Sequence, residues 1–300
     1  MTVLYLRVSP IASLTEPKSE PDLTEAMTPQ TSRAASPAPS PLLHERVGSI
    51  AVLTLDSPAT RNALSEAMID ALQDALDSIR DDKSVRAVVI AAKGPAYSSG
   101  HNLKELTARR SDADKGRAYF AHMMKSCSDM MQSIVRLPKP VVAAVQGVAT
   151  AAGCQLVATC DLAVASDQAT FGTPGIDIGL FCSTPMVALT RNVPRKHAMH
   201  MLLTGEHVSA QRALELGLVN SVVPAGNERE AAIALAERIA VKSAYTLKVG
   251  KEAFYRQAEM SLADAYTYAA QVMTENMMAR DAQEGIGAFI EKRDPKWEDR

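Results

Sequence analysis

Residues 138–161, PKPVVAAVQGVATAAGCQLVATCD, constrain most strongly how this chain can fold. Residues 141–145 have the composition of a buried strand, and Gly147 follows them closely. A run of small residues then leads into a short apolar segment, residues 154–159. This order predicts a strand, a sharp glycine turn and a helix whose first turn has almost no side chains.

A helix that starts in this way has a chemical use. Its first backbone N–H groups lack intrahelical partners, and the helix dipole adds partial positive charge there. The small residues Ala149, Ala151, Ala152 and Gly153 would let a ligand approach that backbone closely. A carbonyl oxygen that gains negative charge is the natural guest. The alternative interpretation is a small-residue turn packed tightly under a neighbouring helix, and this stretch alone leaves both open.

A second glycine turn has the same character. The segment AYSSGHNL, residues 96–103, reads as the end of a strand, then Gly100, then the start of a helix. If the strands before the two turns are adjacent, both helix starts can aim an N–H group at one point. Two such donors are the minimum needed to hold an enolate oxygen.

The remaining chain divides into three parts. Residues 1–44 hold seven of the sixteen prolines, and we expect a disordered extension. Residues 45–227 alternate predicted strands, such as 50–55 and 87–92, with helices, one of which starts at the N-cap Ser65. Residues 228–300 are predicted to be helical only, with apolar side chains suited to contact a second subunit.

Several classes of protein are disfavoured. The net charge is −2 without a basic stripe, which argues against nucleic acid, and no apolar run reaches the ~18 residues of a membrane span. His197 and His200 are three apart on an expected helix but lack a third ligand, so we expect no metal. The N-terminal segment carries acidic residues, unlike a transit peptide. We therefore expect the bacterial cytoplasm, with the mitochondrial matrix as the alternative.

Five blocks in order resemble the crotonase (enoyl-CoA hydratase/isomerase) family, and some of their variants are similar to one subgroup of it. The blocks cover residues 61–64 (RNAL), 95–106 (PAYSSGHNLKEL), 141–166, 171–180 (FGTPGIDIGL) and 284–293 (EGIGAFIEKR). The resemblance implies an α/β fold, a spiral of β-β-α units, with a C-terminal helical region that builds homotrimers or hexamers.

The resemblance also implies ligands and site residues. It implies acyl-CoA ligands, with coenzyme A as part of the thioester substrate and no tightly bound cofactor. By position, the backbone N–H groups of His101 and Ala152 match the family's oxyanion hole. The residues that match CoA contacts, the last two often serving a neighbouring subunit, are Arg61, His101, Asn102, Leu103, Lys104, Phe289 and Lys292.

The chain departs from the family at the acid–base residues. The two glutamates of family hydratases would fall at Gln155 and Gly175. Gln155 can position water or an acyl group but cannot titrate near neutral pH, and Gly175 has no side chain. Asp177 is a speculative acid or base, since on an extended segment it would share a side with Gly175. Its alternative role, like that of Cys154, is structural.

These observations leave three hypotheses. The first is an enoyl-CoA hydratase-like enzyme of fatty acid metabolism that works through an oxyanion hole. The second is a protein that binds acyl-CoA with little catalysis and has a regulatory role. The third is another reaction of a thioester, such as isomerisation or hydrolysis.

Overall fold

The computed structural model describes residues 40–300. Strand β1 (Leu42–Val47) already begins within the segment expected to be disordered, so residues 42–44 belong to the folded core. The rest of the expected extension lies outside the described residues.

The larger sheet has six strands in the order β1-β2-β3-β5-β7-β10. β1 is antiparallel to β2, and the other neighbours are parallel. The bounds of its other strands are β2 (Ile50–Leu55), β3 (Ala87–Ala92), β5 (Val141–Val145), β7 (Leu162–Ser166) and β10 (Ser221–Val223). The strands predicted at 50–55, 87–92 and 141–145 are confirmed.

A smaller sheet has the order β4-β6-β8-β9. Its strands are β4 (Ala96–Ser98), β6 (Val148–Thr150), β8 (Thr170–Gly172) and β9 (Val208–Ser209). The successive pairs β3/β4, β5/β6 and β7/β8 each place one strand in each sheet, which gives the expected spiral of β-β-α units. The sequence pattern does not predict β6, because its three residues lie within the run of small residues between Gly147 and α4.

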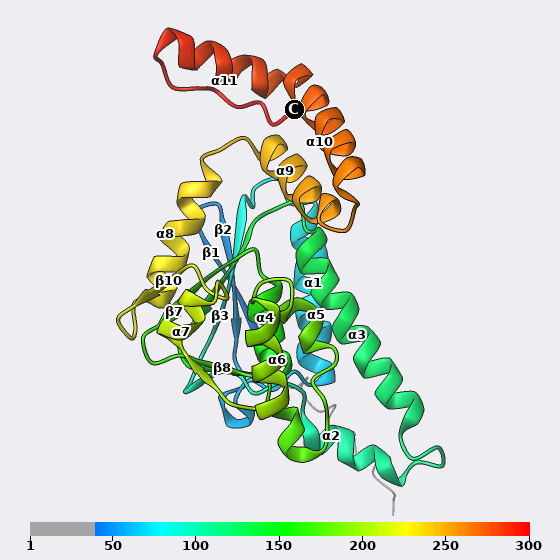
Figure 1. Cartoon of the computed structure of the whole chain (residues 1–300). Coiled ribbons are helices and arrows are strands. Elements are labelled where there is room, and N and C mark those ends of the chain that lie inside the picture. The colour runs from blue at the N-terminus through cyan, green and yellow to red at the C-terminus, as the bar shows by residue number, and fades with distance from the viewer. Residues whose placement is uncertain (1–39) are drawn as a thin grey trace, which may run out of the picture. The chain divides into compact units, whose positions relative to one another are not determined.

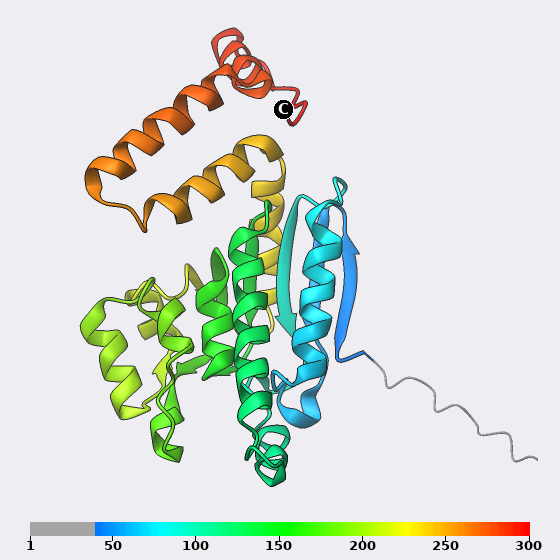
Figure 2. The same cartoon turned by 90° about the vertical axis from the view of Figure 1, so that its right-hand side faces the viewer.

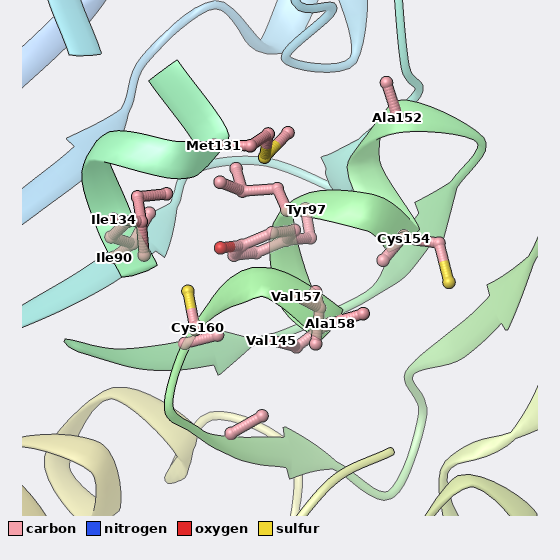
Figure 3. Packing of buried hydrophobic residues seen from close by; sticks show 14 of the residues in the cluster. Ile90, Tyr97, Met131, Ile134, Val145, Ala152, Cys154, Val157, Ala158 and Cys160 are labelled. Atoms are coloured by element: carbon pink, nitrogen blue, oxygen red, sulfur yellow. The ribbon is translucent and has the colours of Figure 1, made fainter. Parts of the chain in front are cut away.

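Helices cover both faces of the larger sheet (Figure 1). On β2, Leu53 packs in one apolar cluster with α1 (Glu66–Arg80), α3 (Arg117–Arg136) and α4 (Ala152–Thr159), whereas Val52 packs in another with α8 (Glu228–Ala240). Successive side chains of a strand face opposite sides, so a sheet covered on both sides needs a continuous apolar strand. Figure 3 shows Tyr97 of β4 packed between α3 and α4.

The shorter helices follow β4 and β8. They are α2 (Leu103–Ala108), α5 (Pro185–Leu189), α6 (Arg195–Thr204) and α7 (Ala210–Glu215), with a 3-10 turn, η3, at Pro174–Ile178. The helix start predicted at Ser65 is confirmed, since its side chain accepts a hydrogen bond from Met68 N.

The last three helices, α9 (Ala244–Gln257), α10 (Leu262–Met278) and α11 (Arg280–Glu291), extend beyond the two sheets (Figure 2). They expose large apolar side chains, among them Phe254, Leu262, Tyr266, Met273, Met278, Phe289 and Ile290. None of the helices within residues 40–300 is long and apolar enough to cross a bilayer.

A part-buried polar cluster of Asp161, Lys251 and Tyr255, the Asp161 cluster, anchors α9 to the core. The Asp161 carboxylate accepts hydrogen bonds from Lys251 Nζ (2.7 Å), Val141 N (2.7 Å) and Tyr255 OH (2.9 Å). The ammonium group of Lys251 also donates to Ile134 O at 2.9 Å and to a second carbonyl oxygen at 3.0 Å. One carboxylate therefore joins β5 and α9, while the ammonium group holds the end of α3.

Candidate functional site

The turn at Gly100 and the turn at residues 151–153, just before α4, lie against each other. Their preceding strands, β4 and β6, are parallel neighbours, with Ser98 opposite Ala149. Gly100 has φ +82°, and a Cβ placed there would lie 3.1 Å from Ala152 N. A Cβ on Gly153 would overlap the carbonyl oxygen of Ser98. The adjacency required in the sequence analysis is therefore confirmed, and no side chain fits between the turns.

The start of α4 is strained and has no side-chain cap. Ala151 adopts φ 52° and ψ −119°, a conformation that residues other than glycine rarely take. Its N–H donates to Gly172 O at 2.9 Å, and its carbonyl oxygen accepts from Gln155 N at 3.0 Å. The next N–H groups, beginning with Ala152, precede the first intrahelical bond. Strain of this kind concentrates at functional sites, and the arrangement suits a negatively charged oxygen.

His101 has a neutral imidazole. Its Nδ1 lies 3.3 Å from Leu64 O, so we assign the proton to Nδ1. Burial lowers the pKa of His101, and the hydrogen bond to Leu64 opposes this only in part. Nε2 is buried without a hydrogen-bond partner among residues 40–300. The neutral ring therefore presents a hydrogen-bond acceptor, Nε2, next to the backbone N–H of His101, which is the candidate donor to an oxyanion.

The position of the first family glutamate holds a buried amide, and the position of the second is closed. Gln155 is only 5% exposed, and its Oε1 has no partner within the described chain. A Cβ on Gly175 would lie 2.6 Å from Leu180 O and 2.8 Å from Cys182 Sγ. The backbone and a thiol thus fill the space into which a side chain at 175 would project.

The cysteines near the site are poor nucleophiles. Burial raises the pKa of Cys154 to about 12 and also raises the pKa of Cys182. Figure 3 shows the Cys154 sulfur pointing away from Tyr97. Since the thiolate is the reactive form, the raised pKa values make both thiols poor nucleophiles at neutral pH.

Asp177 does not share a side with position 175, as was expected for an extended segment. Residues Pro174–Ile178 form the 3-10 turn η3 rather than an extended segment, so residues two apart do not share a side. The exposed Asp177 carboxylate lies against Gly205, where an added Cβ would be 2.9 Å from Oδ2. Its contacts are those of a surface residue.

Most of the candidate CoA contacts lie around the Gly100 turn. The Arg61 backbone is hydrogen-bonded to the turn, since its carbonyl oxygen accepts from Ser99 N at 3.0 Å. Asn102 caps α2, because its Oδ1 accepts from Lys104 N at 3.1 Å. Leu103 is 49% exposed. The side chains of Leu103 and Lys104 are thus accessible to a ligand beside the turn.

Two candidates do not reach this site within one chain. Phe289, 85% exposed, and Lys292 lie on and directly after α11. Figure 1 shows α11 and α2 at opposite ends of the described unit. The resemblance implies that this pair often contacts the CoA of a neighbouring subunit.

Asn62 holds the site together in a way that its sequence pattern did not indicate. Its side chain is fully buried and makes three hydrogen bonds to backbone atoms, including one to Ala96 O in β4 (2.8 Å). The only sequence signal for a buried Asn62 is its place between Arg61 and the apolar helix α1. Its partners Lys93 O and Ala96 O are more than 30 residues away, so the pattern does not reveal them.

The pair His197 and His200 has no metal-ligand geometry. His197 Nδ1 lies 3.4 Å from Arg212 Nη2, and His200 Nε2 lies 3.8 Å from Glu206. No cluster of three or more potential metal ligands occurs within residues 40–300.

Comparisons with known proteins agree with this architecture. Enoyl-CoA hydratase domain-containing protein 3, mitochondrial, from Rattus norvegicus is 46% identical over 272 residues, which cover 90% of this chain and 89% of the relative. The Homo sapiens protein of that name is 47% identical over 259 residues, covering 86% and 84%. The subgroup that the sequence variants resembled is therefore confirmed. These names are mitochondrial and give no support to the expected bacterial cytoplasm.

Solved structures are similar over the same region. An enoyl-CoA hydratase from Mycobacterium smegmatis has a TM-score of 0.81 at 49% identity and covers 86% of this chain and 98% of its own. The human enoyl-CoA hydratase domain-containing protein 3 also has a TM-score of 0.81, at 47% identity, covering 86% and 100%. The model of the enoyl-CoA hydratase/isomerase family matches residues 45–300. The chain belongs to the enoyl-CoA hydratase/isomerase family.

Proposed function

We propose that the protein binds acyl-CoA or enoyl-CoA thioesters and stabilises negative charge on the thioester oxygen. The donors are the backbone N–H groups of His101 and Ala152. The observation that carries this proposal is the contact between the two turns, where Gly100 lies against an uncapped helix start at Ala152. Preorganised backbone donors are effective because they need no reorganisation as charge develops.

The CoA portion binds along the Gly100 turn. Arg61 contacts a CoA phosphate, and residues 101–104 contact the adenine and pantetheine. Phe289 and Lys292 are supplied by a neighbouring subunit. Coenzyme A enters as part of the substrate, and the site needs no tightly bound cofactor. The exposure of Arg61 and Leu103 supports this arrangement.

The proposed activity is that of an enoyl-CoA hydratase-like enzyme of fatty acid metabolism with an unusual acid–base apparatus. Gln155 positions water or the acyl group but cannot exchange a proton. Gly175 has no side chain and the space beside it is filled, so this position supplies no second carboxylate. Each missing acid or base typically costs ~10²- to 10⁴-fold in rate, so we expect slow hydration by this chain.

The test combines binding and turnover. Calorimetric titration with an acyl-CoA should give a saturable Kd, and Arg61→Ala should weaken it by about 10-fold because a charge-assisted bond to phosphate is lost. Loss of the enone absorbance of crotonyl-CoA then measures hydration. Absence of binding at millimolar ligand would reject the proposal.

The second candidate is an acyl-CoA-binding protein of regulatory role with little catalysis. The closed space at Gly175 favours it, since the missing carboxylate cannot simply be restored. Binding without turnover of any thioester would support this candidate. Rapid hydration by the unaltered chain would reject it, whereas isomerisation or hydrolysis of the thioester would indicate the third hypothesis.

The chain assembles into a homotrimer or hexamer through its last three helices. The exposed apolar side chains of α9, α10 and α11 support this, since monomeric proteins rarely leave such patches open. Analytical ultracentrifugation should show a trimer or hexamer. Met278→Glu, at a side chain 71% exposed, should shift the population to smaller species. A monomer at micromolar concentration would contradict this assembly.

The protein acts in mitochondria. The mitochondrial names of relatives at 46% and 47% identity support this location. Expression of the full chain with a C-terminal fluorescent tag in a eukaryotic cell tests it, and a signal spread through the cytosol would count against it.

A further inference from the structure

Two adjacent residues before α1 hold a strained backbone. Arg61 has φ 55° and Asn62 has φ 52°. Both lie in the left-handed region, which Asn adopts more readily than other non-glycine residues and which Arg rarely adopts. Such a pair persists only where surrounding contacts hold it, and it is concentrated at functional sites. The contacts that hold this pair lead directly to the Gly100 turn.

Asn62 ties together three segments through one buried amide. Its side-chain Oδ1 accepts a hydrogen bond from Ser57 N at 2.8 Å. Its Nδ2 donates to Lys93 O and to Ala96 O, each at 2.8 Å. The residue is 0% exposed, so water cannot replace these bonds. The amide therefore fixes the Arg61 loop against the segment that leads into β4.

Three further bonds join this loop to the turn itself. Ser99 N donates to Arg61 O at 3.0 Å, and Leu64 N donates to Gly100 O at 2.8 Å. The ring Nδ1 of His101 donates to Leu64 O at 3.3 Å. The direction of the His101 backbone N–H is thus determined by a loop about 40 residues earlier in the chain.

The Arg61 side chain is free to bind an anion. It is exposed, and it makes no hydrogen bond or ion pair with any residue in the range 40–300. Its carbonyl oxygen meanwhile accepts from Ser99 in the turn. One strained residue therefore offers a cation to solvent and holds the turn through its backbone.

We infer that Asn62 is a positioning residue, and that it couples the phosphate-bearing end of a CoA thioester at Arg61 to the direction of the His101 N–H. This inference rests on the proposed function. A phosphate bound by Arg61 restrains the loop, and the Asn62 hydrogen bonds transmit that restraint to the turn. Binding energy from the nucleotide end of the ligand is thereby used at the thioester carbonyl.

The test measures polarisation of the bound carbonyl, which needs no turnover. The probe is butyryl-CoA labelled with ¹³C at the thioester carbon, followed by its infrared C=O stretch and its ¹³C shift at saturation. Donors at the oxygen should lower the stretching frequency of the bound ligand. Butyryl-pantetheine, which lacks the nucleotide, should show less than half of that displacement on the unaltered chain.

Asn62→Gly deletes the amide and keeps a backbone that tolerates the left-handed conformation. We expect the displacement for butyryl-CoA to fall to the butyryl-pantetheine level, with the calorimetric Kd within about 5-fold of the parent value. Asn227→Gly, at an exposed residue that caps no helix with its side chain, is the matched control and should retain the full displacement.

The outcomes separate the inference from the proposed function. A full displacement in saturated Asn62→Gly, or equal displacements for the two probes on the unaltered chain, would overturn the coupling and leave thioester binding intact. Failure of the unaltered chain to bind butyryl-CoA would reject both. If Asn62→Gly does not fold, the comparison of butyryl-CoA with butyryl-pantetheine on the unaltered chain still tests the coupling.

Discussion

Restoring a carboxylate should succeed at position 155 and fail at position 175. Gln155→Glu is isosteric, and the buried Oε1 it replaces has no partner among residues 40–300. Gly175→Glu must instead add a Cβ 2.6 Å from Leu180 O. The carbonyl would have to retreat by roughly 0.8 Å to reach an ordinary contact, although the Leu180 N–H is bound to Gly175 O at 2.9 Å.

The cost of this retreat can be stated as stability. Overpacking against a backbone atom typically costs about 1–3 kcal/mol. For a domain of this size, about 1 kcal/mol lowers Tm by ~2–4 °C, so Gly175→Ala should lose about 2–12 °C. Gly287→Ala is the matched control, because nothing lies within 4 Å of its added Cβ in α11. It should be neutral or stabilising.

The assay is hydration of crotonyl-CoA followed by its enone absorbance. Gln155→Glu should raise the rate by about 10²-fold, the lower range for a general acid or base. Adding Gly175→Glu should give no further gain, because the new side chain displaces the segment around Leu180. The reasoning is refuted if Gly175→Ala is as stable as Gly287→Ala, or if Gly175→Glu alone raises the rate 10-fold at unchanged stability.

Three further predictions follow from buried contacts. Lys251→Met should cost about 1–3 kcal/mol in urea unfolding, because it leaves the part-buried Asp161 carboxylate without its cation. The exposed Lys248→Met should stay within about 0.5 kcal/mol, and an equally small loss in Lys251→Met would contradict this. Gly153→Ala should push Ser98 away from α4 and abolish the carbonyl displacement of bound butyryl-CoA, while a normal spectrum would show that the turns need no contact. Burial lowers the pKa of His101, so the unfolded chain takes up this proton at a higher pH than the folded chain. The free energy of unfolding therefore falls as the pH drops below ~6.5. Between pH 7 and 5, His101→Asn should lose less stability than the parent, and equal losses would argue against a buried neutral ring.

The sequence predicted the parts of the fold that depend on local pattern. The buried strand at residues 141–145 and the capped helix at Ser65 have clear periodicity and turn chemistry. The contact between the two turns could be stated only as a condition, because pairing of β4 with β6 joins segments about 50 residues apart.

The site was predicted less completely for a physical reason. Asp177 was placed by assuming an extended backbone, but Pro174 and Gly175 favour a tight 3-10 turn. The three hydrogen bonds of the Asn62 side chain could not be predicted, because all of its partners are backbone atoms that the tertiary fold brings to it. The closed space at Gly175 likewise depends on Leu180 and Cys182, whose positions no local pattern determines.

The Asp161 cluster has a consequence for how such chains diverge. A single replacement of Lys251 or Tyr255 leaves the part-buried Asp161 carboxylate without one of its partners. Joint replacement of all three side chains by apolar residues removes the charges together and costs less, although Val141 N and Ile134 O then need other partners. Intermediates with one replacement are therefore less stable than either end point. Positions 161, 251 and 255 are expected to covary among descendants of a common ancestor, so that the joint of α9 with the core is inherited as a unit.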